Sequence, residues 1–229
     1  MYADVIAAGI PYDATATGQA DGTAVLAGVE SGYWLIVETP ASGYSGTYSL
    51  VILDTVGVRN ISVSTKRDTL TLEKRVQDNG TNYGTFADHQ IGEDASFWIL
   101  TDVPDHTVGF ATYTYIIHDK METGLTFNND VTLHVNDIGG STLTKDVHYS
   151  VKTEGLTDGC SFHIAVDIKK AIADNALKAT DRIYTTYTAR LNKNAQILVD
   201  GTDTANANEN KAWLEYSKDP YHESDTIKT

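Results

Sequence analysis

Short apolar runs separated by turn residues follow one another along most of the chain. Tyr33–Val37 and Tyr48–Leu53 are such runs near the start, with glycine, serine and proline clusters around them. Runs of this length between turn residues are typical of β-strands. From Lys66 to Tyr216 the runs are longer and rich in threonine, valine, isoleucine and tyrosine, which suit a pleated, half-buried surface. The pattern therefore predicts an all-β protein.

The second part of the chain is expected to form a β-sandwich. Its candidate strands are Thr69–Val76, Ser96–Leu100, Val108–His118, Val131–Val135, His148–Val151, Ser161–Val166, Ile183–Leu191 and Lys211–Tyr216. Short strands with regular turn signals indicate a sandwich. The segment Asp167–Leu177 departs from this pattern, because its apolar residues recur at nearly 3.6-residue spacing, and it predicts a short crossover helix.

Composition divides the chain into two modules. Residues 1–65 hold six acidic residues and one arginine. About four strands fit into this segment, which are few for an independent sandwich. We therefore expect part of a β domain at residues 1–62, a complete sandwich domain at 63–218 and a polar linker at 219–229.

Charge and cysteine content exclude several functional classes. The 229 residues carry a net charge of −14, which repels nucleic acids and anionic membranes, so neither is expected as a partner. No apolar run approaches the roughly 18 to 20 residues that span a bilayer. The lone Cys160 excludes an internal disulfide and a zinc site made of clustered thiolates. The seven histidines form no His-Glu-x-x-His pattern, and we predict no metal and no cofactor.

Three polar side chains are expected on inward faces of the sandwich, because alternate residues of a strand share a face. Lys74 has the same parity as the leucines of its strand, and Asp119 continues a row of inward tyrosines. Asn210 enters the inward face of the last strand. Asn208 has the same parity as Asn210 and is its main competitor.

These residues allow two interpretations. Buried charges are usually paired, so Lys74 and Asp119 can form an ion pair to which the asparagine is hydrogen-bonded. Alternatively, desolvation makes the lysine a neutral nucleophile and keeps the aspartate protonated. The amine would then attack the asparagine carboxamide, ammonia would leave, and an isopeptide bond would remain.

Four ordered motifs resemble the isopeptide-forming domain of Gram-positive fimbrial shaft proteins. They are Leu72–Val76, Asp88–Glu93, Tyr115–Met121 with Gly124–Phe127, and Asn210–Ser217, which lie in this order within residues 61–220. The resemblance implies an immunoglobulin-like β-sandwich of the collagen-adhesin A type. It also implies that Lys74 is the nucleophile, Asp119 the catalytic acid and Asn210 the bonded amide.

The first segment and the stretch after it are similar to other parts of such proteins. Residues 1–60, with Gly32–Ile36, resemble the C-terminal half of the amino-terminal pilin domain. Lys66 stands where backbone pilins often carry a Tyr-Pro-Lys motif, whose lysine a sortase joins to the next subunit. The tyrosine and proline are absent here, so Lys66 is either this acceptor or a solvated linker lysine. No C-terminal sorting signal is present, as expected for a fragment cut at a domain boundary.

The resemblance implies a structural subunit of a Gram-positive cell-surface pilus that supports adhesion. It would be extracellular and wall-anchored, with other pilin subunits, a pilus-specific sortase and a host surface or matrix ligand as partners. It would not be an enzyme beyond one turnover on itself. The alternative is an adhesin module without a cross-link that binds a glycan or matrix protein, for which Trp98 and Trp213 are candidates.

Two further candidate sites have weaker support in the sequence. Asp119 and Glu122 form an acid pair of the kind that glycosidases use, but no sequence feature ties them to a substrate cleft. Oxygen ligands for calcium are available between residues 200 and 208, but their spacing does not match an EF-hand loop. A solvated hairpin loop is the preferred interpretation of that segment. The possible calcium ligands are Asp200, Asp203, Asn206 and Asn208.

Overall fold

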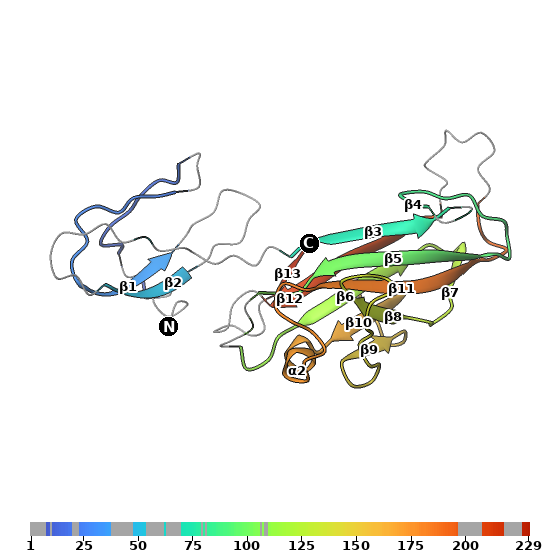
Figure 1. Ribbon diagram of the computed structural model, residues 1–229. Helices are drawn as coiled ribbons and strands as arrows, with labels where there is room; N and C mark the ends of the chain where they lie inside the picture. Colours follow the sequence, from blue (N-terminus) through green and yellow to red (C-terminus); the bar gives the residue numbers. More distant parts are fainter. Residues whose placement is uncertain are drawn as a thin grey trace. The chain divides into compact units, whose positions relative to one another are not determined.

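The computed structural model divides the chain into two compact units, Met1–Arg67 and Asp68–Thr229 (Figure 1). The boundary falls slightly after the one expected between residues 62 and 63. The structure describes residues 8–9, 11–19, 23–37, 48–53, 62, 70–78, 80, 82–105, 107, 110–196, 208–217 and 226–229.

The first unit contains an antiparallel strand pair. β1 (Gly32–Val37) pairs with β2 (Tyr48–Leu53), so that Tyr33 lies opposite Ile52 and Leu35 opposite Leu50. These are the two apolar runs that the sequence predicts as strands. Further strands predicted in this segment are not found among its described residues.

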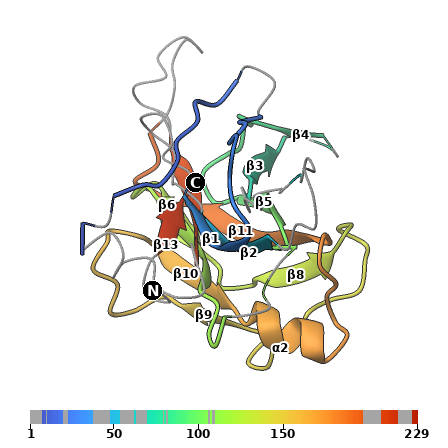
Figure 2. The ribbon, with the colours of Figure 1, turned by 90° about the vertical axis from the view of Figure 1, so that its left-hand side faces the viewer.

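The second unit contains two antiparallel sheets in its described part (Figures 1 and 2). One sheet has the order β13 (Thr226–Lys228), β12 (Asn210–Ser217), β6 (Tyr115–Met121), β10 (Phe162–Val166), β9 (Tyr149–Lys152). The other has the order β4 (Tyr83–Gly84), β3 (Leu72–Gln77), β5 (Asp94–Asp102), β11 (Arg182–Leu191), β7 (Leu125–Phe127), and β8 (Thr132–Val135) also pairs with β11. The first and last long strands, β3 and β12, thus belong to different sheets.

The core lies between the two sheets and confirms the predicted sandwich. Burial alternates along β11, as expected for a strand with one face against the core. Ile99 and Ile183 of one sheet and Ile117 and Leu214 of the other are completely buried. Stacked aromatic pairs fill part of the interior, with ring centroids 3.9 Å apart for Phe127 and Phe162.

The predicted crossover helix is present but short. α2 (Ile168–Ala173) follows β10 and leads to β11 in the other sheet. The side chain of Asp167 caps it by accepting a hydrogen bond from the backbone N–H of Lys170 at 2.9 Å. The helix ends before the predicted Leu177 because Asn175 adopts a left-handed conformation, with φ of 59°.

Several strand boundaries differ from the prediction. β6 starts at Tyr115 rather than Val108, and the carbonyls of Phe110 and Ala111 accept hydrogen bonds from the Lys169 amine instead of a strand partner. The very short strands β4, β7 and β13 were not predicted. The linker predicted at 219–229 is wrong for Thr226–Lys228, because β13 pairs with the end of β12.

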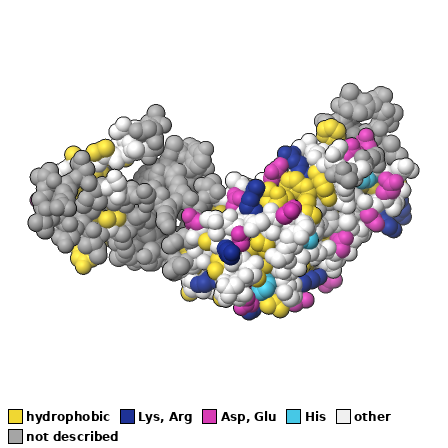
Figure 3. Space-filling view, in the orientation of Figure 1, with side chains coloured by type: hydrophobic (Ala, Val, Ile, Leu, Met, Phe, Trp, Pro, Cys, Tyr) yellow, Lys and Arg dark blue, Asp and Glu magenta, His cyan; other side chains and the backbone are white. Residues whose placement is uncertain are grey.

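Among the described residues, no helix is long and apolar enough to span a bilayer. On the face of the second unit seen in Figure 3, basic and acidic side chains are interspersed. In the whole chain, acidic residues outnumber basic residues by 31 to 17.

Candidate functional site

Three strands bring Lys74, Asp119 and Asn210 together inside the sandwich. Lys74 lies on β3 of one sheet, whereas Asp119 and Asn210 lie on the neighbouring strands β6 and β12 of the other. Each has the parity of its strand's core-facing residues, as the sequence predicts. The alternation of side chains across a strand therefore directs all three groups into the space between the sheets.

The three side chains are in direct contact. The Lys74 amine donates hydrogen bonds to Asp119 Oδ2 at 2.6 Å and to Asn210 Oδ1 at 2.5 Å. The carboxamide carbon of Asn210 is one bond beyond that oxygen, so the amine lies beside the atom that it would attack. This proximity is the main requirement for an uncatalysed amide exchange to become fast inside a protein.

A fourth residue, Tyr187 on β11, completes the network. Its hydroxyl donates to Asp119 Oδ2 at 2.8 Å and accepts from Asn210 Nδ2 at 3.0 Å. No motif in the sequence distinguishes this tyrosine. Its inward parity within β11 was the available signal, but that parity is shared with Ile183, Thr185 and Ala189, which are ordinary core residues.

Burial changes the protonation preferences of this network. The Asp119 side chain is 0% exposed and that of Lys74 12% exposed, and the rings of Phe97 and Tyr187 lie within 5.7 Å of the amine. Desolvation lowers the pKa of Lys74 to about 8, although Asp119 opposes this shift. Desolvation likewise raises the pKa of Asp119 against the opposing effect of Lys74. Both directions favour a neutral amine beside a protonated carboxyl group.

Tyr187 stays protonated in this environment. Burial, and then the negative charge of Asp119, raises the pKa of Tyr187 well above its usual value. Asp119 Oδ1 has no hydrogen-bond partner in the described part of the chain. Burial of a charged carboxylate oxygen without a hydrogen-bond partner costs free energy, and this cost also favours the protonated form of Asp119.

The structure separates the two competing asparagines. Asn208 pairs with the backbone of Gln196, accepting from its N–H at 2.9 Å and donating to its carbonyl at 3.0 Å. Asn210, not Asn208, contacts Lys74. Lys66, the predicted sortase acceptor, lies outside the described residues, as do Asp200, Asp203 and Asn206 of the possible calcium loop.

The other predicted candidates occupy different surroundings. Asp119 is buried against Lys74, whereas Glu122 is exposed, so they do not form a catalytic carboxylate pair. Trp98 is half-buried and packs against Tyr83 and Tyr184. Trp213, also half-buried, stacks on a histidine. Both tryptophans therefore have packing partners within the domain.

Known proteins resemble this chain in structure but not detectably in sequence. The sequence matches no protein-family model, and no curated protein matches it significantly. The structure is similar to the major pilin subunit BcpA of Bacillus cereus, with 15% identity and a TM-score of 0.55 over 93% of this chain and 61% of that one. It is also similar to a 35 kDa C-terminal fragment of the major pilin of Streptococcus agalactiae, with 20% identity and a TM-score of 0.51 over 71% of this chain and 53% of that one.

A third similar structure is a backbone pilin of Streptococcus pyogenes, with 19% identity and a TM-score of 0.50 over 86% of this chain and 39% of that one. The chain thus spans between 39% and 61% of the length of these three pilin structures. The likeness shows that the chain has the β-sandwich fold of Gram-positive backbone pilins.

Proposed function

We propose that this chain is part of a structural subunit of a Gram-positive cell-surface pilus, locked by an isopeptide bond between Lys74 and Asn210. The observation that carries the proposal is the contact of the Lys74 amine with both Asp119 and Asn210 in one buried site. The shared fold of backbone pilins supports the cellular role. An extracellular, wall-anchored location and assembly with other pilin subunits belong to the same proposal.

The reaction starts from the neutral Lys74 amine and the protonated Asp119 carboxyl group. The amine nitrogen attacks Cγ of Asn210 while Asp119 hydrogen-bonds to the carboxamide oxygen and stabilises its developing negative charge. A proton passes from the attacking nitrogen to the departing Nδ2 by way of the Asp119 carboxyl group. The Cγ–Nδ2 bond breaks, ammonia leaves, and the Lys74 Nζ–Asn210 Cγ bond remains. Asp119 ends protonated, as it began.

Tyr187 is a positioning residue in this scheme. Its hydroxyl contacts both Asp119 Oδ2 and Asn210 Nδ2, so it fixes the acid and the leaving amide relative to each other. Folding holds the reacting groups in contact, and effective molarities in well-oriented reactions reach about 10⁵ M or more. No external enzyme is needed, and the single turnover consumes the nucleophile, so the protein is not an enzyme in the usual sense.

The bond has a mechanical consequence because of where it lies. It joins β3 of one sheet to β12 of the other, across 136 residues of sequence. A pull on the two ends of the domain would pass from β3 to β12 through covalent bonds. The hydrogen bonds of the intervening strands would then carry none of the load.

Single-molecule force spectroscopy tests this function. In the parent protein, unfolding of the second unit should release none of the chain between the two bonded residues. In Asn210→Ala the same unit should extend further by 136 residues, or about 450–490 Å at roughly 3.3–3.6 Å per residue. Asn208→Ala, which leaves the site intact, should behave like the parent. Equal extension of the parent and Asn210→Ala would contradict the proposed function.

For polymerisation we propose Lys66 as the residue that a pilus sortase joins to the next subunit. The support is its position before the sandwich domain, where backbone pilins carry their acceptor lysine. In cells that make the full-length protein and its sortase, Lys66→Arg should abolish covalent multimers, whereas Lys152→Arg should not. Multimers that persist in Lys66→Arg would leave Lys66 as a solvated linker lysine.

A further inference from the structure

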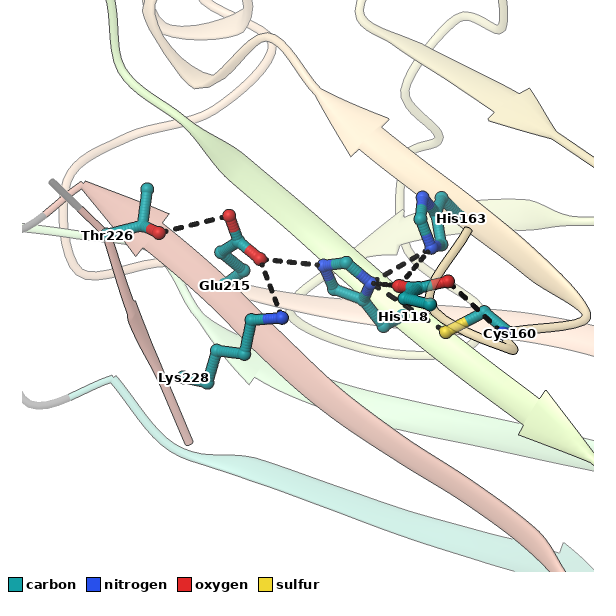
Figure 4. A network of polar contacts seen from close by, with 7 residues as sticks. His118, Cys160, His163, Glu215, Thr226 and Lys228 are labelled. Carbon is teal, nitrogen blue, oxygen red and sulfur yellow. Dashed lines mark hydrogen bonds and ion pairs between the residues drawn. The ribbon is translucent and has the colours of Figure 1, made fainter. Parts of the chain in front are cut away.

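A second polar cluster lies on the opposite, outward face of the sheet that carries Asp119. His118 of β6 and His163 of β10 lie directly opposite each other in the strand register. Asp158 and Cys160, from the loop between β9 and β10, belong to the same group. Figure 4 shows Cys160 and His163 beside His118. One donor atom from each of the four side chains lies within 4.8 Å of all the others.

The spacing of the donor atoms is close to that of the ligands of one metal ion. His118 Nδ1 lies 3.0 Å from both His163 Nε2 and Asp158 Oδ2, and 3.8 Å from Cys160 Sγ. His163 Nε2 lies 2.9 Å from Asp158 Oδ2. Around a tetrahedral zinc ion with bonds of about 2.0–2.3 Å, such atoms would be about 3.3–3.6 Å apart. Three of the observed distances are about 0.3–0.4 Å shorter than this range and one is about 0.2 Å longer, so small side-chain shifts would place the four atoms around one ion.

The surroundings of His118 orient its ring toward the cluster. Nε2, on the far side of the ring, lies 3.2 Å from Glu215 Oε2, an ion-pair distance without hydrogen-bond geometry in the described part of the chain. With a metal ion on Nδ1, the ring proton would be on Nε2 and would face this carboxylate. Glu215 is in turn held by Lys228 at 3.2 Å and by the Thr226 hydroxyl at 3.0 Å. Trp213 stacks on the ring with an interplanar angle of 9°. A carboxylate behind a histidine is the usual support of a metal-binding imidazole.

Local backbone geometry lets the loop supply two ligands from positions two residues apart. Gly159 lies between Asp158 and Cys160 and has φ of +78°, a conformation that other residues rarely adopt. Asp158 Oδ1 also accepts a hydrogen bond from the Cys160 N–H at 3.2 Å. The turn therefore directs a carboxylate and a thiol to the same side.

We propose that His118 Nδ1, His163 Nε2, Asp158 and Cys160 bind one zinc ion. A thiolate with two imidazoles favours zinc over calcium or magnesium, which prefer oxygen ligands. Four protein ligands make a closed, structural site. On binding, the Cys160 thiol loses its proton to solvent and the sulfur bonds to the metal. The ion fastens the β9–β10 loop to β6, on the face opposite the isopeptide site.

This proposal revises the sequence-based expectation that the protein has no metal site. Cys160 is the lone cysteine, and its partners are Asp158, His163 at the second position of β10, and His118 on the distant strand β6. Only the register of β6 and β10 shows that His118 and His163 are neighbours. The proposal does not depend on the isopeptide bond, because the two sites use different residues.

Metal titration of the complete, metal-free chain tests the proposal. With a chromophoric chelator as competitor, the protein should take up one equivalent of zinc, and its melting temperature should rise with zinc concentration. Cobalt(II) in place of zinc should give a thiolate charge-transfer band in the near ultraviolet. Cys160→Ser should lose this band, and His163→Ala should lose stoichiometric uptake. His134→Ala, which alters a histidine that contacts Thr186 on β11, should retain both.

Two results would overturn the proposal. One is no stoichiometric uptake by the folded parent, which would make the cluster a hydrogen-bonded network only. The other is equal uptake by the parent, Cys160→Ser and His163→Ala, which would place the metal elsewhere. Glu215→Gln provides a finer test, because loss of a supporting carboxylate should weaken zinc binding about 10- to 100-fold while the cobalt–thiolate band persists.

Discussion

At the residue scale, side-chain parity predicted the three central groups of the site. An amine, a carboxyl group and a carboxamide on inward faces are conspicuous, because polar groups rarely enter a core without a reason. Their mutual contact required the three-dimensional packing of β3 against β12. Tyr187 was not predictable in this way, since an inward tyrosine is an ordinary core residue until its hydroxyl partners are known.

The role of Tyr187 leads to a prediction about the rate of cross-linking. Tyr187→Phe removes a hydroxyl that contacts Asp119 and Asn210, and each loses a partner in a buried site. A loss of about 1–3 kcal/mol should slow bond formation about 5- to 150-fold. Time-resolved intact mass after synthesis in a cell-free system measures the linked fraction. Tyr184→Phe, on the same strand, is the control and should react like the parent; equal rates for all three proteins would contradict this role.

At the element scale, the longer strands and the helix were predictable from the sequence, whereas the shortest strands were not. The runs that became β5, β10, β11 and β12 carry enough alternation to be recognised, and so does the helical period of α2. β4, β7 and β13 have two or three residues each, too few to show a period. These short strands form because the backbone groups of a longer neighbouring strand are available for hydrogen bonding. That availability depends on the whole fold and cannot be inferred from the short segment alone.

The cap of α2 gives a prediction at this scale. Asp167→Ala removes the side-chain acceptor for the Lys170 N–H and should lower the free energy of unfolding by about 1 kcal/mol. Denaturant unfolding monitored by tryptophan fluorescence measures the change. Asp167→Asn keeps an acceptor oxygen and should remain close to the parent. If the alanine variant is as stable as the asparagine variant, the cap contributes nothing to the stability of the domain.

At the scale of the whole molecule, the proposed bond would convert two stacked sheets into one covalently closed unit. The sandwich is otherwise held by its buried core and by hydrogen bonds within each sheet. A link across 136 residues restricts the unfolded chain much as a long-loop disulfide does. In the chain-entropy model this contributes about 5 kcal/mol to stability.

Thermal unfolding tests that contribution. Asn210→Ala should melt about 10–20 °C below the parent, because a domain of this size loses roughly 2–4 °C per kcal/mol. This variant leaves Lys74 and Asp119 paired, so the loss is not inflated by an unpaired buried charge. Asn208→Ala loses two hydrogen bonds to Gln196 but keeps the link, and should show only a small decrease. Similar melting temperatures for the two variants would argue against a stabilising bond at Asn210.

The intact mass of the denatured protein tests the central claim most directly. We expect a chain lighter than its sequence by one molecule of ammonia, and peptide mapping should find Lys74 joined to Asn210. Asp119→Ala should have the full sequence mass, because the acid that assists the attack is missing. A parent protein with the full sequence mass would contradict the account and leave Lys74, Asp119 and Asn210 as a buried, hydrogen-bonded ion pair.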